Sequence, residues 1–286
     1  MIKHPAQHFF LQELVDYAGI FPPAGLPLAQ ALENYRCYQQ GLAPSMLGRF
    51  ICGGAALDQL ADLLQESDRF QLSVLLSKPE EVALVEAFHQ RVSKSVRVDT
   101  VETAWNEQAS EWPAAWNYRL FFEVTPQQAG PAARLCAPQA ARLCLKLRTG
   151  SVKAEGIPSP NSVLAFLEEA HRARVGYKFT AGLHHAKAGC YPLTYEADAP
   201  RAGCFGFTSL FGLACLHWHG RLDGNQLLEG LGSQDVPRLD ESGLSWATAH
   251  CGVDEIVEYR RAGGRGFGSC SFEEPLQELQ EMGWIC

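Results

Sequence analysis

Two neighbouring β-rich segments decide the fold: residues 143–150, which read LCLKLRTG, and residues 175–185, which read VGYKFTAGLHH. In each segment apolar residues alternate with polar ones, and an amphipathic helical pattern at Asn161–Arg174 separates the two. A strand, a helix and a second strand in this order predict two parallel strands joined by a crossover helix. The two segments therefore indicate an α/β fold.

Similar β-rich runs recur along the rest of the chain, and helical patterns lie between most of them. The runs predict eight strands, at Val15–Phe21, Gly48–Gly53, Gln71–Leu76, Val96–Thr103, Tyr118–Thr125, Leu143–Thr149, Val175–Leu183 and Gly266–Ser271. Eight parallel strands close into a barrel whose interior is filled by side chains, and 286 residues suffice for one such domain. We therefore predict a single (β/α)8 TIM-type barrel over residues 1–286.

One connection, between the seventh and eighth strands, is far longer than a single helix requires. It contains apolar helical patterns at about Phe205–His219, Gly224–Gly230 and Val253–Arg260. Connections of this length usually serve as lids or contact surfaces. We predict a helical insertion at about residues 190–262 that packs beside the barrel mouth or in a subunit contact, and its apolar character is compatible with a homodimer.

The composition excludes several classes of protein. Hydrophobic residues make up 47% of the chain, the formal net charge is −8, and no basic block is longer than a pair. These values argue against a nucleic-acid-binding or membrane-binding surface, and no apolar run is long enough to span a bilayer. The ten cysteines form no C-x-x-C pair, and the first residues lack a signal-peptide pattern. A cytoplasmic location is therefore expected.

Strand alternation directs several polar side chains into the barrel. Outward leucines in the sixth strand place Lys146 and Arg148 inside, and outward aromatic residues in the seventh strand place Lys178 and Thr180 inside. Active sites of this fold lie at the carboxyl ends of the strands. We therefore expect the two lysines to meet in the mouth of the barrel.

Two buried lysines in contact favour a neutral amine, because neighbouring cations lower each other's pKa. A neutral lysine attacks carbonyl carbons to form a Schiff base. The same alternation directs Asp99 of the fourth strand and Glu123 of the fifth strand inward. These carboxylates suit either proton transfer or a structural charge network with Lys146 and Lys178, and spacing alone does not decide between the two roles.

The two lysine segments resemble the paired lysine strands of deoxyribose-phosphate aldolases. Asp99 matches the fourth-strand aspartate of that family, residues 14–17 resemble its first strand, and residues 267–271 resemble its last, phosphate-binding strand. The chain is also similar to an uncharacterised bacterial βα-barrel family that has the same KLRTG, TAGLHH and FGSCSF runs. Both resemblances imply a βα-barrel, and the first implies class I aldolase chemistry.

The aldolase resemblance implies that Lys146 forms the Schiff base, that Lys178 lowers its pKa and that Asp99 relays protons. It also implies that Ser269 and Ser271 contact the substrate. Arg148 stands where the aldolase pattern has a small residue. Because a guanidinium holds carboxylates bidentately, Arg148 suits an anionic substrate. The leading hypothesis is a Schiff-base aldolase or lyase that acts on a small anionic carbonyl metabolite without a metal or cofactor.

Two alternatives stay open. The first is a metal-assisted lyase or isomerase that uses His184, Asp99 and Glu123. The second is a non-catalytic barrel that binds an anionic metabolite through the cationic groups Lys146, Lys178 and Arg148.

Three further features lie near the expected mouth. Adjacent residues of a strand point in opposite directions, so at most one of His184 and His185 should reach the site. Residues 20–25 are rich in proline and glycine and are expected to form a pocket wall. Cys270 is expected to be a reduced packing cysteine.

Overall fold

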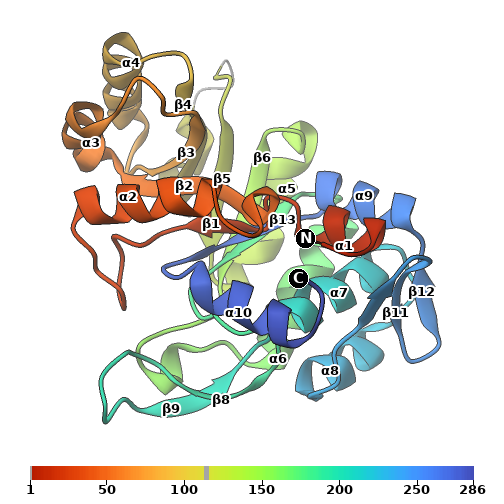
Figure 1. Ribbon diagram of the computed structural model, residues 1–286. Coiled ribbons are helices and arrows are strands. Elements are labelled where there is room, and N and C mark those ends of the chain that lie inside the picture. The colour runs from red at the N-terminus through yellow and green to blue at the C-terminus, as the bar shows by residue number, and fades with distance from the viewer. Residues whose placement is uncertain (1, 113–115) are drawn as a thin grey trace.

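The computed structural model describes residues 2–112 and 116–286. Eight strands form a closed parallel barrel in the order β1-β13-β7-β6-β5-β4-β3-β2 (Figure 1). They are β1 (Val15–Tyr17), β2 (Leu47–Gly53), β3 (Phe70–Leu75), β4 (Val96–Ala104), β5 (Arg119–Val124), β6 (Leu143–Arg148), β7 (Tyr177–Thr180) and β13 (Gly264–Ser269). Each predicted run overlaps one of these strands, so the predicted (β/α)8 TIM-type fold is confirmed.

Helices lie between the strands along the chain and cover the outside of the barrel (Figure 1). They are α1 (Pro5–Leu11), α2 (Leu28–Gln39), α3 (Leu57–Leu63), α4 (Val82–Arg91), α5 (Ala129–Cys136), α6 (Pro160–Arg172), α7 (Phe207–Trp218), α8 (Gly224–Gly232), α9 (Val253–Ala262) and α10 (Glu273–Glu281). Short 3₁₀ turns occur at Pro44–Met46, Gly54–Ala56, Pro79–Glu81, Glu107–Glu111, Pro126–Gln128, Ala137–Gln139 and Ala154–Gly156.

Helix α6 shows why the sequence folds as it does between the two lysine strands. The Ser159 hydroxyl accepts a hydrogen bond from the Ser162 backbone N–H, and Pro160 occupies the first helical position. The apolar residues that follow at helical spacing are all buried: Val163, Phe166, Leu167 and Ala170. One face of α6 therefore packs on the barrel and fixes β6 beside β7.

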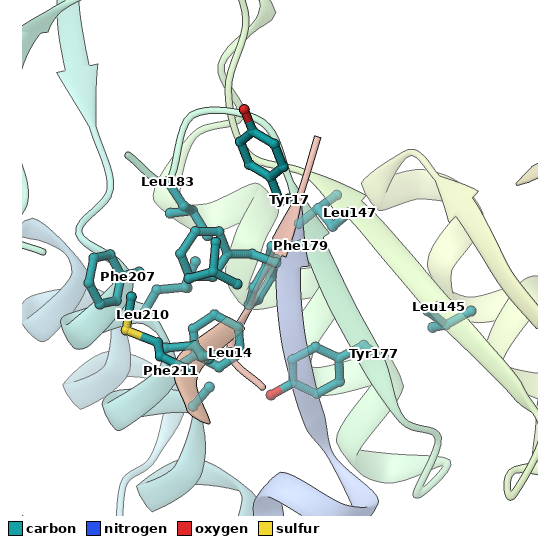
Figure 2. Packing of buried hydrophobic residues seen from close by; sticks show 14 of the residues in the cluster. Leu14, Tyr17, Leu145, Leu147, Tyr177, Phe179, Leu183, Phe207, Leu210 and Phe211 are labelled. Atoms are coloured by element: carbon teal, nitrogen blue, oxygen red, sulfur yellow. The ribbon is translucent and has the colours of Figure 1, made fainter. Parts of the chain in front are cut away.

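The largest part of the core lies between the barrel and its helices. Leu145, Leu147, Tyr177 and Phe179 point away from the barrel axis and are buried (Figure 2). The Phe179 ring lies 5.3 Å from the Phe211 ring of α7, measured between centroids. The predicted outward direction of these four residues is confirmed, and it leaves the intervening polar residues to fill the interior.

The connection between β7 and β13 contains the three predicted helices, α7, α8 and α9, but it also contains strands that we did not predict. It contains an antiparallel hairpin, β8 (Gly189–Pro192) and β9 (Arg201–Cys204), and a three-stranded sheet, β10 (Arg238–Asp240), β11 (Gly243–Trp246) and β12 (Ala249–Cys251). These strands are three or four residues long. Alternation over so few residues gives no distinguishable period, and therefore the pattern did not reveal them.

The parts of this connection have different locations. Helix α7 covers the outer face of the barrel, where Phe207 stacks on Phe267 of β13. The three-stranded sheet adjoins α1, because the Gln7 side chain donates a hydrogen bond to the Leu239 carbonyl oxygen. Residues just after β7 and the segment from β8 to β9 line the cavity described below, whereas α7, α8, α9 and the three-stranded sheet do not. Of the predicted insertion at residues 190–262, only the part up to Cys204 therefore lines the cavity, and a subunit contact by the remainder stays a prediction.

The first and last described segments of the chain meet. Ile2 and Ile285 form an antiparallel backbone bridge, and the two ends of the chain lie near each other in Figure 1. Among residues 2–112 and 116–286, no helix is both long and apolar enough to cross a membrane.

Candidate functional site

A cavity of about 620 Å³ opens at the carboxyl ends of the strands. Its floor includes Glu102 of β4, Lys146 of β6 and Thr180 of β7. The loop after β1 supplies one wall through Phe21 and Pro22, as we predicted for residues 20–25. This location and volume are typical of a small-molecule site in this fold.

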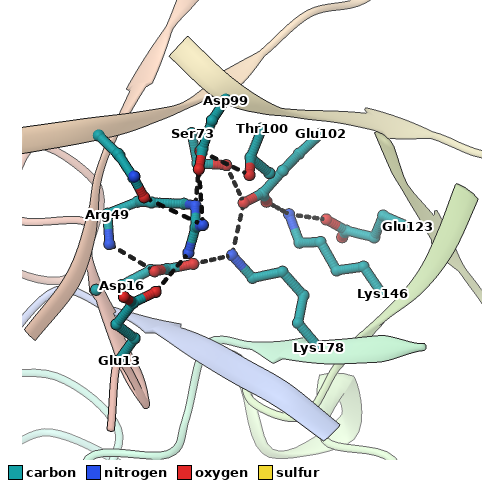
Figure 3. A network of polar contacts seen from close by, with 12 residues as sticks. Glu13, Asp16, Arg49, Ser73, Asp99, Thr100, Glu102, Glu123, Lys146 and Lys178 are labelled. Carbon is teal, nitrogen blue, oxygen red and sulfur yellow. Dashed lines mark hydrogen bonds and ion pairs between the residues drawn. The ribbon is translucent and has the colours of Figure 1, made fainter. Parts of the chain in front are cut away.

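The two predicted lysines lie inside the barrel in one charged layer (Figure 3). The Lys146 Nζ atom is 2.6 Å from Glu102 Oε2 and 2.8 Å from Glu123 Oε2. The Lys178 Nζ atom is 2.7 Å from Glu102 Oε1 and 2.5 Å from Asp16 Oδ2. Both lysines are almost completely buried, at 3% and 1% exposure. Their predicted inward direction is confirmed.

Glu102 is the centre of this layer. Its carboxylate accepts hydrogen bonds from both lysines and from the Ser73 hydroxyl, and the residue is 1% exposed. Burial alone would raise the pKa of this carboxyl, but Lys146 and Lys178 outweigh burial and hold the pKa far below its ordinary value. Glu102 is therefore ionised and serves as a shared counter-ion.

The charge balance differs from the one that the sequence suggested. Burial would lower the pKa of Lys178, but Asp16 and Glu102 outweigh burial and raise it. The expectation that crowded cations would leave a lysine neutral therefore does not hold for Lys178. Burial likewise opposes ionisation of Glu123, whereas Lys146 and Arg148 lower the pKa of its carboxyl.

Asp99 contacts Arg49 and neither lysine, so of the two roles left open for it, a charge network with Lys146 and Lys178 is not formed. Its carboxylate accepts hydrogen bonds from Arg49 Nε at 2.7 Å, from a terminal Arg49 nitrogen at 2.8 Å and from the Thr100 hydroxyl at 3.0 Å. The bidentate contact with Arg49 holds Asp99 away from the carboxyl-end cavity, whose lining does not include it.

An irregularity in β4 explains why Glu102, and not Asp99, meets the lysines. The pairing of β3 with β4 shifts register between Leu72 and Ser73, so that Leu72 pairs with Val98 and Ser73 pairs with Thr100. One extra residue, Asp99, therefore lies between the two pairs, as in a β-bulge, and the alternation of inward and outward residues reverses beyond it. Uninterrupted alternation from Val98 would direct Glu102 outward, and for this reason the sequence pattern missed it.

The remaining predicted substrate-binding residues fall into two groups. Arg148 and Thr180 line the cavity, and the Arg148 side chain is 54% exposed with its Nε 3.0 Å from Glu123 Oε1. Ser269 and Ser271 are not among the lining residues; their hydroxyls accept hydrogen bonds from backbone N–H groups of residues 271 and 274. The two serines therefore shape the turn after β13.

A second polar cluster lies in the cavity wall. The His184 Nδ1 atom is 2.6 Å from Glu274 Oε2, and the His184 Nε2 atom is 3.7 Å from the Cys270 sulfur. The Tyr195 hydroxyl donates a hydrogen bond of 3.1 Å to the same Glu274 oxygen. Each of these four residues lines the cavity. Cys270 is buried, as a packing cysteine would be, but it also contacts an imidazole that a carboxylate orients.

His184 is the basic centre of this cluster. Burial lowers its pKa, but hydrogen bonds to Cys270 and Glu274 outweigh burial and raise the pKa to about 9. The imidazole is therefore protonated at neutral pH.

His184 and His185 both line the cavity, so the expectation that only one of them reaches the site is wrong. Strand β7 ends at Thr180, and Ala181 and Gly182 have positive φ angles of 60° and 73°. Strand alternation does not apply beyond that point. His185 contacts a carboxylate of its own, with 2.6 Å between its Nδ1 and Glu278 Oε1.

The residues proposed for a metal site lie apart. His184 contacts Glu274, Asp99 contacts Arg49, and Glu123 contacts Lys146. Within the described part of the chain, no group of three or more histidine, cysteine, aspartate or glutamate side chains is arranged to hold a metal ion.

Comparison with protein-family profiles and with curated protein sequences gives no match, so an assignment of function rests on the side chains of the cavity.

Proposed function

We propose that this protein is a Schiff-base lyase of the aldolase type, acting on a small anionic carbonyl compound through Lys146. The observation that supports this proposal most is the position of the Lys146 ammonium. It is buried in the floor of the carboxyl-end cavity and lies 2.8 Å from Glu123, a carboxylate that is itself partly exposed.

Glu123 is the proton acceptor in this proposal. Lys146 must lose a proton before its nitrogen attacks the carbonyl carbon. A carbinolamine then forms, and the nitrogen gives up a second proton. Glu123 transfers both protons from the nitrogen to the former carbonyl oxygen, which then leaves as water. The product is an iminium ion. When the bond between the α and β carbons breaks, its electron pair forms an enamine with the iminium, the β-hydroxyl gives its proton to Glu123, and the fragment leaves as an aldehyde. Glu123 returns that proton to the α carbon, and water then hydrolyses the iminium and frees Lys146.

Substrate binding would promote this proton transfer. Arg148 holds Glu123 at 3.0 Å and helps to keep the pKa of its carboxyl low. An anionic substrate group that binds the Arg148 guanidinium would draw it away from Glu123. The proton affinity of Glu123 would then rise at the moment when Lys146 must be deprotonated. The relay role that the resemblance assigns to Asp99 thus passes to Glu123, and Lys178 positions Glu102.

Borohydride reduction tests the proposal. The protein is incubated with a panel of 2-oxo acids and short aldehydes, reduced with borohydride, and analysed by intact mass and peptide mapping. We expect an adduct at Lys146 with at least one anionic carbonyl compound. The absence of any adduct across the panel, or an adduct only at the exposed Lys153, would contradict the proposal.

A second candidate function rests on a different observation. Cys270, His184 and Glu274 have the order of contacts typical of a nucleophile, an imidazole that transfers protons and a carboxylate that orients the imidazole. The Cys270 thiolate would attack an activated acyl carbon, the leaving group would take a proton from His184, and water would release the acid. This candidate is an acyl-transfer or hydrolytic enzyme that uses the same cavity.

Alkylation by iodoacetamide tests this second function, with Cys204 as an internal control. Cys204 also lines the cavity, but burial raises the pKa of its thiol, and its sulfur contacts the Ala202 carbonyl oxygen instead of an imidazole. At pH 7 we expect Cys270 to react faster than Cys204, because its sulfur lies beside the protonated imidazole of His184 and that of Cys204 does not. The rates are read from peptide mass spectra.

Two variants complete this test. His184→Gln should slow alkylation of Cys270 to the rate of Cys204, and His8→Gln, at an exposed histidine, should leave it unchanged. Equal rates at Cys270 and Cys204 in the unmodified protein would argue against a thiolate nucleophile.

A further inference from the structure

A second cavity, of about 240 Å³, lies at the opposite end of the barrel. Its lining includes residues near the amino ends of three strands, Arg49 of β2, Arg119 of β5 and Arg265 of β13. Helix α9 adds Arg260 and Arg261, and the exposed Arg261 marks the side on which the cavity meets solvent. Five guanidinium groups therefore surround one small space.

Three of these arginines have a buried donor without an acceptor. The Nε atoms of Arg119, Arg260 and Arg265 are inaccessible to solvent, and no acceptor in residues 2–112 or 116–286 bonds to them. In the same range, Arg119 and Arg265 form no ion pair with a carboxylate, whereas the terminal nitrogens of Arg260 reach only backbone carbonyl oxygens. Buried donors and buried charges are normally paired, so three unpaired Nε–H groups around one cavity indicate a missing acceptor.

The nearby carboxylates do not neutralise this cluster because other groups already bind them. Asp16 accepts hydrogen bonds from Lys178 and from the Arg49 backbone N–H. Asp99 is held bidentately by the Arg49 side chain, and Glu13 lies 3.5 Å from the same guanidinium. Within residues 2–112 and 116–286, no carboxylate therefore forms an ion pair with Arg119, Arg260 or Arg265, although Glu13 and Asp16 also line the cavity.

Neighbouring cations affect the pKa of Arg265, whereas the pKa of Arg260 is lowered by burial against the nearby Glu13 and Asp16. Burial lowers the pKa of Arg265 to about 10, and repulsion from Arg119, Arg260 and Arg49 adds to this effect. Burial also lowers the pKa of Arg260 to about 10. A bound anion would remove this repulsion and would stabilise the folded protein.

We propose that the amino-end cavity is a binding site for a phosphate group, which Arg119, Arg260 and Arg265 hold. A guanidinium offers two parallel N–H donors that match a phosphate oxygen pair, and its charge is permanent at physiological pH. The size of the cavity suits inorganic phosphate or the phosphate end of a small metabolite. The site does not depend on the carbonyl chemistry proposed above, since it lies at the other end of the barrel.

Thermal unfolding in the presence of inorganic phosphate tests the site. The reference is sodium chloride at the same ionic strength, which removes general screening effects. At a phosphate concentration about a hundredfold above Kd, we expect the unfolding temperature to rise by about 5 °C. Pyrophosphate should act in the same direction. A rise with citrate but not with phosphate would overturn the assignment to phosphate in favour of a polycarboxylate.

The variant Arg265→Met distinguishes specific phosphate binding in the amino-end cavity from a general effect of charge on stability. It should abolish the rise caused by phosphate. Its unfolding temperature in chloride should equal or exceed that of the unmodified protein, because a buried uncompensated cation has been removed. The control Arg134→Met removes an exposed arginine on α5 and should retain the full rise.

Isothermal calorimetry with phosphate on the unmodified protein gives an independent measurement if Arg265→Met does not fold. Saturable binding of one phosphate per chain supports the proposal. No heat of binding beyond the chloride reference, or an equal phosphate response in both arginine variants, would overturn it.

Discussion

Lys146→Ala is expected to abolish covalent trapping of carbonyl compounds by borohydride. Only a primary amine that reaches the substrate forms a reducible Schiff base, and Lys146 is the lysine that lines the carboxyl-end cavity. Lys178 lies in the same layer but lines the amino-end cavity, and its ammonium is held by Asp16 and Glu102. Intact mass after reduction, followed by peptide mapping, measures the effect.

Two control variants test whether loss of trapping is specific to Lys146. Lys153→Ala removes an exposed lysine and should trap the substrate as the unmodified protein does. Lys178→Met should still give an adduct at Lys146, because the nucleophile and Glu123 are retained. Trapping that survives in Lys146→Ala and disappears in Lys178→Met would reverse the proposed roles of the two lysines.

Glu102→Gln is expected to destabilise the folded protein by about 3–5 kcal/mol, as for other buried ion pairs that lose one partner. The carboxylate accepts hydrogen bonds from Lys146, Lys178 and Ser73 at the same time. A neutral amide leaves two buried ammonium groups with one counter-ion fewer, and its own N–H donors face other donors. The free energy of unfolding from urea denaturation measures the loss.

The exposed Glu86 provides the matched control, and Glu86→Gln should change stability by less than about 0.5 kcal/mol.

The pH dependence of stability gives a further check on the role of Glu102. In the folded state burial would raise the pKa of Glu102, but Lys146 and Lys178 outweigh burial and lower it. The ionised carboxylate therefore stabilises the folded protein above pH 4.5, the ordinary pKa of the group, and this stabilisation is lost as the pH falls. The difference between the unmodified protein and Glu102→Gln should therefore narrow below about pH 4.5. A difference that stays constant in acid would show that the ionised carboxylate is not the source of the stability.

The sequence predicted the barrel because long-range order in this fold follows from local patterns. Each strand has its own alternation of apolar and polar residues, and the closed arrangement follows from repeating one strand–helix unit. The inward positions of Lys146 and Lys178 follow from alternation in β6 and β7, where the register is regular through Arg148 and Thr180. The same argument placed Glu123 correctly beside Lys146.

The sequence pattern could not predict features that interrupt local periodicity. The extra residue in β4 places Glu102, and not Asp99, beside the lysines, and the residue types of β4 do not predict this irregularity. The positive φ angles of Ala181 and Gly182 bring His184 into the cavity. The contact of His184 with Glu274 joins residues from distant parts of the chain, and no spacing rule predicts such a pair.

The pairing of β1 with β13 has a consequence for how the protein folds during synthesis. Strand β1 is only three residues long, and it needs β13, made near the end of the chain, as its neighbour on one side. Strand β7 also pairs with β13. Until β13 leaves the ribosome, the nascent sheet has two open edges, and open edges promote aggregation. The carboxyl-end cavity also lacks Cys270 and Glu274 until then. During the interval between translation of β7 and translation of β13, which includes the whole long connection, the nascent sheet therefore keeps both edges open.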